Sequence, residues 1–203
     1  MKNPVINVLT RTSNRPDFFK RCVGSIKNQT YKNVRHLVSA DNQESYDYAN
    51  TLVDDVFLVE KRKDIKRYGN NYKPYNFYIN DLLDHVEDGF VLILDDDDIL
   101  SGATALEKIL PHLQEDMLSV WLVDNEGRIT PHKGAMQAPV LIPTEITASS
   151  FAFHSKHKWA ARWDAVRGAD YRAAQRLSWL LGYSWINEVI VKIPKAHGGE
   201  TNV

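Results

Sequence analysis

FVLILDDDDIL, residues 90–100, places four apolar residues, Val91–Leu94, directly before four aspartates, Asp95–Asp98. An apolar run without alternation is typical of a strand buried on both faces, as in a parallel sheet. Open α/β sheets bind ligands beyond the carboxyl ends of their strands, which is where these carboxylates would lie. Four adjacent like charges repel one another, so the run predicts a compensating cation. Oxygen ligands favour Mn²⁺ or Mg²⁺, and we predict a site for one of these ions together with a diphosphate.

The four aspartates are expected to differ in role. Successive side chains of an extended segment point to opposite sides, so Asp95 and Asp97 share one face. We predict that Asp98 serves the turn into a following helix at residues 102–113. The alternative is that the whole run only initiates that helix, although a cap needs one aspartate rather than four.

Length and composition indicate one ordinary globular domain. The chain has 203 residues, of which 43% are hydrophobic and 25% charged, with a net charge of −1. The absence of a basic excess argues against nucleic acid as the main partner. A single cysteine, Cys22, fits a reducing compartment, and neither a signal peptide nor a membrane-spanning apolar run is present. We therefore expect a cytoplasmic location, and the end at HGGETNV suggests one domain of a larger polypeptide.

Hydrophobic periodicity and turn residues predict alternating strands and helices. Strands are expected at residues 5–9, 34–39, 54–60, 91–94, 117–123, 128–130, 146–154 and 184–193. Helices are expected at residues 17–29, 74–86, 102–113 and 170–181, with a loop at 61–73 and irregular chain at 131–143. The first strand, helix and strand form a right-handed βαβ unit. The prediction is a single α/β domain whose sheet is parallel in its first half and mixed later.

Five segments carry a resemblance to a known family. They are VLTRTSNRP at 8–16, SIKNQTYKN at 25–33, HLVSADN at 36–42, LILDDDD at 92–98 and RGADYRAAQRLSWLLGY at 167–183. In order and spacing the sequence resembles the family 2-like glycosyltransferases of the GT-A fold, across nearly the whole chain. It is similar in particular to amino-terminal domains of large chlorovirus glycosyltransferases, which would place it in the host cytoplasm.

The resemblance implies one GT-A domain over residues 1–203, with a mixed, mostly parallel sheet flanked by helices. It also implies an inverting transferase that moves a hexose or deoxyhexose from a UDP-sugar to a hydroxyl of a glycan or glycoprotein, with Mn²⁺ or Mg²⁺. Residues 1–98 would bind the nucleotide sugar. Residues 99–203 would bind the acceptor and supply the catalytic base.

Site residues follow from the resemblance by position. Donor contacts are implied for Thr10, Arg11, Thr12, Asp41, Asp95 and Asp96, with Asp41 on the uracil edge. Asp95–Asp97 match the family's Asp-x-Asp, and the metal ligands would be Asp97, Asp95 and the late His197. Further contacts to phosphate or base are expected from a basic segment, at Arg67, Lys73 and Asn76. Each of these residues also has an ordinary alternative as a solvated loop or turn residue.

Asp170 matches the acidic residue that acts as general base in this family. The acceptor hydroxyl must lose its proton as it attacks the anomeric carbon, so one positioned carboxylate suffices. The usual Glu-Asp pair is here Ala169-Asp170. The alternative is that Asp170 only caps its helix, and Asp164 is the second choice for the base.

The tryptophans divide into two predicted groups. Trp159 and Trp163 are candidates for stacking on an acceptor sugar, whereas Trp179 and Trp185 fall in periodic apolar segments and are expected in the core.

Other classes of protein remain as alternatives. A haloacid-dehalogenase-type phosphatase also places Asp-x-Asp after a buried strand, but the motif here lies mid-chain with no late aspartate pair. A nucleotidyltransferase would need a Gly-rich phosphate loop with a lysine after the first strand, which the chain lacks. A nucleotide-sugar-binding module without transfer would have no use for a positioned Asp170.

Overall fold

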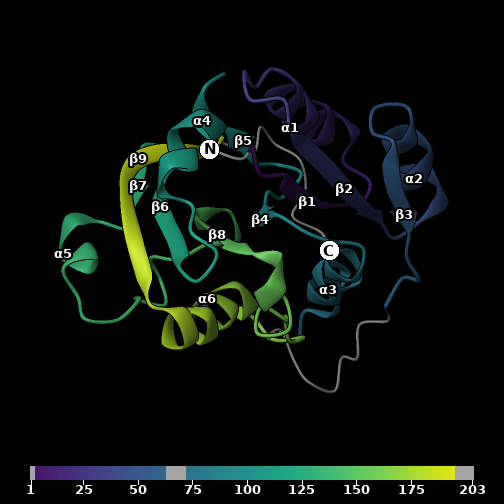
Figure 1. Ribbon diagram of the computed structural model, residues 1–203. Helices are drawn as coiled ribbons and strands as arrows, with labels where there is room; N and C mark the ends of the chain where they lie inside the picture. The colour runs from purple at the N-terminus through teal and green to yellow at the C-terminus, as the bar shows by residue number, and fades with distance from the viewer. Residues whose placement is uncertain (1–2, 63–71, 195–203) are drawn as a thin grey trace.

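A nine-stranded sheet runs through the computed structural model, which describes residues 3–62 and 72–194 (Figure 1). Its strands follow the order β3 (Asp55–Leu58), β2 (Val34–Ala40), β1 (Ile6–Thr12), β4 (Phe90–Ile93), β8 (Phe151–His154), β6 (Leu118–Asn125), β9 (Tyr183–Ile193) and β5 (Ile99–Leu100), and β7 (Arg128–Thr130) pairs with β6. The first four strands are parallel, and β8 lies antiparallel between β4 and β6. The two longest ladders, β1 with β2 and β6 with β9, are parallel. This confirms the predicted α/β class and the change to mixed pairing after β4.

Strand β4 is buried on both faces, as its unbroken apolar sequence predicts. Val91 and Ile93 contribute to one core cluster, and Leu92 and Leu94 contribute to a second on the other side of the sheet. The strand pairs with β1 in parallel register, with Leu9 opposite Ile93. Together these contacts fix where the acidic run leaves the sheet.

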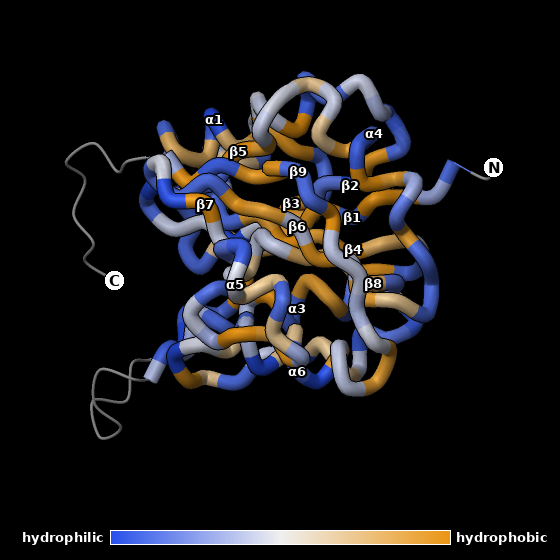
Figure 2. Tube along the Cα trace, turned by 90° about the vertical axis from the view of Figure 1, so that its left-hand side faces the viewer, coloured by the Kyte–Doolittle hydropathy of each residue, from blue (hydrophilic) through white to orange (hydrophobic). Residues whose placement is uncertain are grey.

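Helices cover both faces of the sheet (Figures 1 and 2). α1 (Pro16–Lys27) and α4 (Ala105–Ile109) pack on the face of Leu92, and α3 (Phe77–Asp84) and α6 (Ala169–Leu181) pack on the opposite face. The remaining elements are α2 (Gln43–Asn50), α5 (Lys133–Met136) and the short 3₁₀ segments η2 (Pro74–Asn76), η3 (Leu110–His112), η4 (Ala148–Ser150) and η5 (Ser155–His157). Figure 2 shows the apolar strands enclosed between these two layers. Among the described residues, no helix has the length and apolar character needed to cross a bilayer.

Several elements differ from their predicted bounds for local reasons. Helix α2 is missing from the prediction because only Ser45 and Ala49 are buried in it, so it has no apolar stripe; the Asn42 side chain caps it by accepting from the Ser45 N–H at 2.8 Å. The predicted helix 102–113 is α-helical only over Ala105–Ile109 and continues as the 3₁₀ segment η3, because Pro111 has no N–H to donate to the carbonyl four residues earlier. The predicted strand 146–154 begins only at Phe151, after η4.

The prediction of a core position for Trp179 is wrong, because its side chain is 70% exposed. Helix α6 buries Ala169, Ala173 and Leu177, which follow one another at four-residue spacing. Two residues beyond Leu177, Trp179 lies on the opposite side of the helix. Trp185, on β9, is partly buried and packs against the core as expected.

Gly89 is expected to be required for the turn into β4. Its φ is +90°, and a Cβ at this position would lie 2.3 Å from the Val5 carbonyl oxygen. Gly89→Ala should lower the free energy of unfolding by about 2 kcal/mol or more, measured by urea denaturation. Gly24→Ala in α1 is the matched control, because nothing lies within 4 Å of its Cβ position and alanine favours a helix. Equal stability of the two variants would contradict this account of the turn.

Candidate active site

The site begins where β1 and β4 end side by side. The Leu94 N–H donates to the Leu9 carbonyl at 3.0 Å, and the Thr10 hydroxyl donates to the Leu94 carbonyl at 2.8 Å. The Thr10 hydroxyl also contacts the His36 ring at 2.9 Å, and burial lowers the pKa of His36 to about 3, so the ring is neutral. Thr10 is fully buried, and its side chain fixes the strand ends. The prediction had placed this side chain in the lining of a ligand pocket.

Two arginines, one near the end of β1 and one in the loop after it, pair with the acidic run. Arg11 donates to both carboxylate oxygens of Asp95, from Nε at 2.8 Å and from Nη2 at 3.1 Å. Arg15 pairs with Asp97 at 3.0 Å and with Asp96 at 2.5 Å. The compensation predicted for the clustered carboxylates is therefore supplied in part by the protein itself. Arg15 was missed in the sequence, although it lies in the TRTSNRP segment four residues after Arg11.

Asp96 and Asp98 point into the protein. Asp96 is fully buried and accepts from the Thr12 hydroxyl at 2.8 Å. Burial raises its pKa to about 7, against the opposing effects of Arg15 and Thr12. Burial and the neighbouring carboxylates also raise the pKa of Asp98 well above its usual range. Asp96 thus supports the site from beneath, and its predicted contact with the donor stays a prediction. The turn at Asp98 leads into β5 before the helix.

The accessible carboxylates of the run suit a metal shared with a substrate. The side chain of Asp97 is 37% exposed and that of Asp95 is 22% exposed. Within residues 3–62 and 72–194, no group of three or more His, Cys, Asp or Glu residues is arranged to hold an ion. Mg²⁺ in phosphate-transfer sites typically binds one or two carboxylates plus substrate oxygens, and Mn²⁺ also prefers oxygen ligands. Asp97 and Asp95 fit that arrangement, and the predicted ligand His197 lies outside the described residues.

Asp41 lies at the end of β2, next to the loop after β1. Its carboxylate accepts from the Asn42 amide at 2.9 Å and from the Tyr78 hydroxyl at 3.5 Å. The residue is 7% exposed. Its predicted contact with a uracil edge stays a prediction, and Arg67, predicted nearby, falls outside the described residues.

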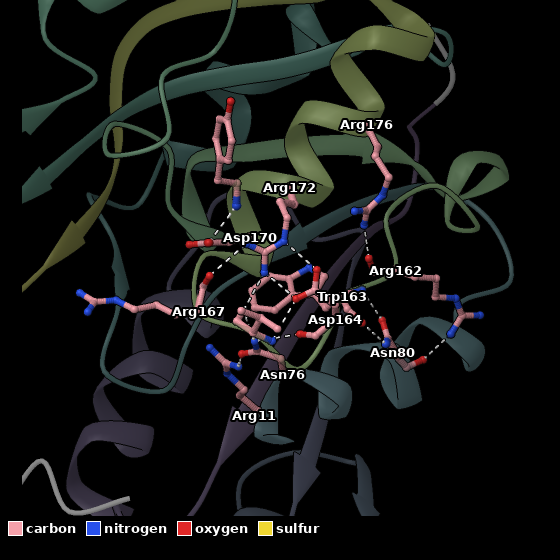
Figure 3. A network of polar contacts seen from close by, with 12 residues as sticks. Arg11, Asn76, Asn80, Arg162, Trp163, Asp164, Arg167, Asp170, Arg172 and Arg176 are labelled. Atoms are coloured by element: carbon pink, nitrogen blue, oxygen red, sulfur yellow. Dashed lines mark hydrogen bonds and ion pairs between the residues drawn. The ribbon is translucent and has the colours of Figure 1, made fainter. Parts of the chain in front are cut away.

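A pocket of about 140 Å³ brings together predicted site residues from both halves of the chain. It is lined by Arg11, Lys73, Tyr75, Asn76, Trp163, Arg167, Gly168, Ala169 and Asp170. Figure 3 shows several of these residues converging between α3 and the start of α6. The donor candidates Arg11, Lys73 and Asn76 therefore lie beside the proposed base.

Arg11 connects this pocket to the acidic run. Its Nη1 donates to the Asn76 amide oxygen at 3.1 Å while the rest of the guanidinium holds Asp95. The guanidinium carbon lies 4.9 Å from the centre of the Tyr75 ring and 5.2 Å from that of Trp163. Cation–π contacts with two rings hold the guanidinium in one orientation. Tyr75 was missed in the sequence because a single aromatic at the start of a helical segment carries no pattern.

Asp170 lies in the first turn of α6, facing the pocket. The cap of this helix is Gly168, in the left-handed region at φ 81°, so capping alone does not account for Asp170. The Asp170 carboxylate accepts from the Tyr171 N–H at 2.8 Å. Burial and then Asp95 raise its pKa, which brings the carboxylate closer to the basicity that a general base needs.

Asp164 is a poor candidate for the base. Its two oxygens accept from Arg172 at 2.7 and 2.5 Å, and this pairing lowers the pKa of Asp164. A carboxylate held in this way is weakly basic. The geometry therefore favours Asp170 over Asp164.

The two tryptophans proposed for sugar stacking lie in separate places. Trp163 is 5% exposed and lines the pocket with Asp170. Trp159 is 65% exposed and lines a different hollow of about 550 Å³, together with Asp116, Lys156, His157, Leu180 and Leu181. The structure thus does not bring the predicted pair together.

The comparison with protein families is decisive for the class of protein. Residues 8–150, more than half of the chain, match the model described as Glycosyl transferase family 2. The chain belongs to glycosyl transferase family 2. The predicted enzyme class, glycosyltransferase, is thereby confirmed.

A curated relative and two solved structures agree with this assignment. The chain is 34% identical over 133 residues to the GalNAc(5)-diNAcBac-PP-undecaprenol beta-1,3-glucosyltransferase of Campylobacter jejuni, covering 63% of this chain and 41% of that protein. It resembles S. aureus TarS 1-349 in complex with UDP-GlcNAc at a TM-score of 0.69 and 14% identity, covering 96% of this chain and 59% of that chain. It resembles the mannosyltransferase PcManGT of Pyrobaculum calidifontis, in complex with GDP-Man and Mn²⁺, at a TM-score of 0.65 and 13% identity, covering 98% and 59%. These two structural likenesses confirm the predicted GT-A fold.

Asp96 is expected to make folding depend on pH. Because its folded pKa, about 7, lies above the ordinary value of 3.8, the folded state holds a proton between these pH values that the unfolded state has lost. Stability contributed by this proton is present at low pH and is lost as the pH rises through 7. Asp96→Asn should therefore gain about 1–3 kcal/mol relative to wild type between pH 5 and pH 8, measured by urea denaturation.

Asp97→Asn is the matched control for this measurement, since it removes a more exposed carboxylate of the same run. It should show a smaller change relative to wild type. Parallel stability curves for Asp96→Asn and wild type would contradict the assignment of the proton to Asp96.

Proposed function

We propose that the chain is a metal-dependent inverting glycosyltransferase that moves a hexose or deoxyhexose from a UDP-sugar to a hydroxyl of a glycan or glycoprotein. The observation that carries the proposal is the pocket in which Arg11, bound to Asp95 of the acidic run, lies beside Asp170. The pocket thus places a group suited to the donor next to a group suited to the acceptor. Residues 1–98 would bind the donor and residues 99–203 would bind the acceptor.

The donor class is supported by the structural neighbours. TarS is described in complex with UDP-GlcNAc and with UDP, and PcManGT in complex with GDP-Man. The Campylobacter relative is named as a glucosyltransferase. UDP or a UDP-sugar appears in the two descriptions of TarS, and this supports a UDP-linked donor. The chain spans 41% of the Campylobacter relative, so the acceptor of that protein does not transfer directly to this chain.

The proposed reaction is a single displacement at the anomeric carbon. The acceptor oxygen forms a bond to that carbon, the bond from the carbon to the diphosphate oxygen breaks, and UDP leaves. Asp170 takes the proton of the acceptor hydroxyl as its oxygen attacks. One base and one attack give inversion, in contrast to the two carboxylates of glycoside hydrolysis.

The remaining residues of the site orient these groups. Arg11, fixed by Asp95, Asn76 and two aromatic rings, holds the acidic run against the pocket. Asp97, with Asp95, would hold Mn²⁺ or Mg²⁺, and His197 is proposed as a further ligand. When bound, the ion would stabilise the negative charge that develops on the departing diphosphate.

The alternatives to this proposal have less support. A haloacid-dehalogenase-type phosphatase would need its first aspartate as a free nucleophile, whereas Arg11 holds both oxygens of Asp95. A module that binds a nucleotide sugar without transfer gives no reason for a buried base with a raised pKa at the pocket. The cytoplasmic location, the viral source and the place within a larger polypeptide remain predictions.

Asp170→Asn is expected to keep donor binding and abolish transfer. The asparagine preserves shape but cannot accept the proton, so kcat should fall at least about 100-fold while the Kd for UDP stays within about twofold. In wild type the acid limb of kcat/KM should lie above the ordinary aspartate pKa of 3.8, because the base must be deprotonated and its pKa is raised. Asp164→Asn is the comparison variant. Turnover like wild type in Asp170→Asn would remove Asp170 from the mechanism.

UDP binding is expected to depend on a divalent cation and on Asp97. Isothermal titration with UDP should show at least about tenfold weaker binding after a chelator is added, because the diphosphate loses its shared cation. Asp97→Ala should bind UDP equally weakly with and without Mn²⁺. An affinity that does not change with the chelator in wild type would refute metal dependence, whatever the result for Asp170.

A further inference from the structure

The loop at residues 164–168, which joins the pocket to α6, is held by hydrogen bonds to its backbone carbonyls. The Asn76 amide donates to the carbonyls of Asp164 at 3.0 Å and Val166 at 3.2 Å. The Lys73 N–H donates to the Ala165 carbonyl at 2.7 Å. From α6, Arg172 donates to the Val166 carbonyl at 2.9 Å.

Arg172 also fixes the residue that carries the next cation. Its Nη1 donates to the Arg167 carbonyl at 3.0 Å, while its other nitrogens hold Asp164 (Figure 3). The backbone carbonyl of Arg167 is therefore held by α6. Its own guanidinium, like the Lys73 ammonium, makes no hydrogen bond or ion pair with any residue in the described part of the chain.

Both of these cations line the pocket that contains Asp170. The third cation of the lining, Arg11, is compensated by Asp95. The pocket therefore presents two uncompensated positive charges against one carboxylate. A pocket lined by two cations that have no partner within the described residues is suited to bind an anion.

We propose that the acceptor carries an anionic group, a phosphate or a carboxylate, that Lys73 and Arg167 recognise beside Asp170. This inference rests on the proposed function, because it takes Asp170 to be the base that contacts the acceptor. It names the acceptor class, which is a glycan or sugar with a negative charge near the hydroxyl that reacts.

The position of these two cations beside the base indicates that the anionic group belongs to the acceptor and not to the donor. The donor diphosphate already has partners in Asp97 with its shared cation, whereas Lys73 and Arg167 share a pocket with the base. An anion placed next to a carboxylate is repelled and raises the pKa of that carboxylate. Two cations would offset that repulsion and keep Asp170 ready to accept a proton.

The test uses the indole N–H of Trp163 as a reporter. Trp163 lines the pocket and is 5% exposed, and its indole N–H is buried without a hydrogen-bond partner among the described residues. Its ¹H–¹⁵N signal can be assigned with Trp163→Phe and followed during titration of the protein saturated with UDP and Mg²⁺. The probes are glycerol 1-phosphate for a phosphate, glucuronate for a carboxylate and methyl glucoside as the neutral comparison.

At least one anionic probe should shift the Trp163 signal with at least about tenfold higher affinity than methyl glucoside. The Lys73→Gln/Arg167→Gln double variant, titrated at a UDP concentration that saturates it, should lose this preference at least tenfold. Lys20→Gln/Arg21→Gln, which removes the same two charge types from the exposed side of α1, should keep it. The stronger anionic probe identifies the group as phosphate or carboxylate.

Equal affinity for charged and neutral probes would overturn the inference. A second outcome would also overturn it: the double variant loses UDP binding, and wild type saturated with UDP binds neither anionic probe. The two cations would then bind the donor. The same titration without UDP tests the preference for anions independently. Failure of UDP to bind wild type would instead refute the proposed function.

Discussion

The compensation of four adjacent aspartates is the constraint on which the site depends. Arg11, near the end of β1, and Arg15, in the loop after it, pair with Asp95, Asp96 and Asp97. This pairing is possible only because β1 and β4 are parallel neighbours that end at the same edge of the sheet. The segment after β4 therefore carries the negative charges, and the end of β1 with the loop after it carries the positive charges that compensate them.

Features with a regular pattern were predictable from the sequence. The unbroken apolar run before Asp95 predicts the doubly buried β4, and the motif order predicts the GT-A fold. The sequence predicted only that one site contains Arg11, Asn76 and Asp170. That they share a pocket is a property of the fold, because α3 and α6 come together only after β8 and β6 have extended the sheet.

Features that depend on single long-range contacts were not predictable. Helix α2 lacks an apolar stripe, and Trp179 occupies an apolar segment while facing solvent. The inward orientation of Asp96 and the pairing of Asp164 with Arg172 are set by partners that adjacent sequence does not reveal. A list of acidic residues gives candidates for a base, but burial and pairing decide between them.

The central position of β8 bears on how such domains can be recombined. This strand comes from the carboxyl-terminal half, yet it pairs with β4 of the amino-terminal half and with β6. The proposed boundary between a donor-binding and an acceptor-binding half therefore does not coincide with a boundary between folding units. A fragment that ends after the acidic run would leave β4 as an unprotected apolar edge. Chimaeras that exchange acceptor preference between relatives must therefore keep β8 matched to β4, so loops are safer units of exchange than halves.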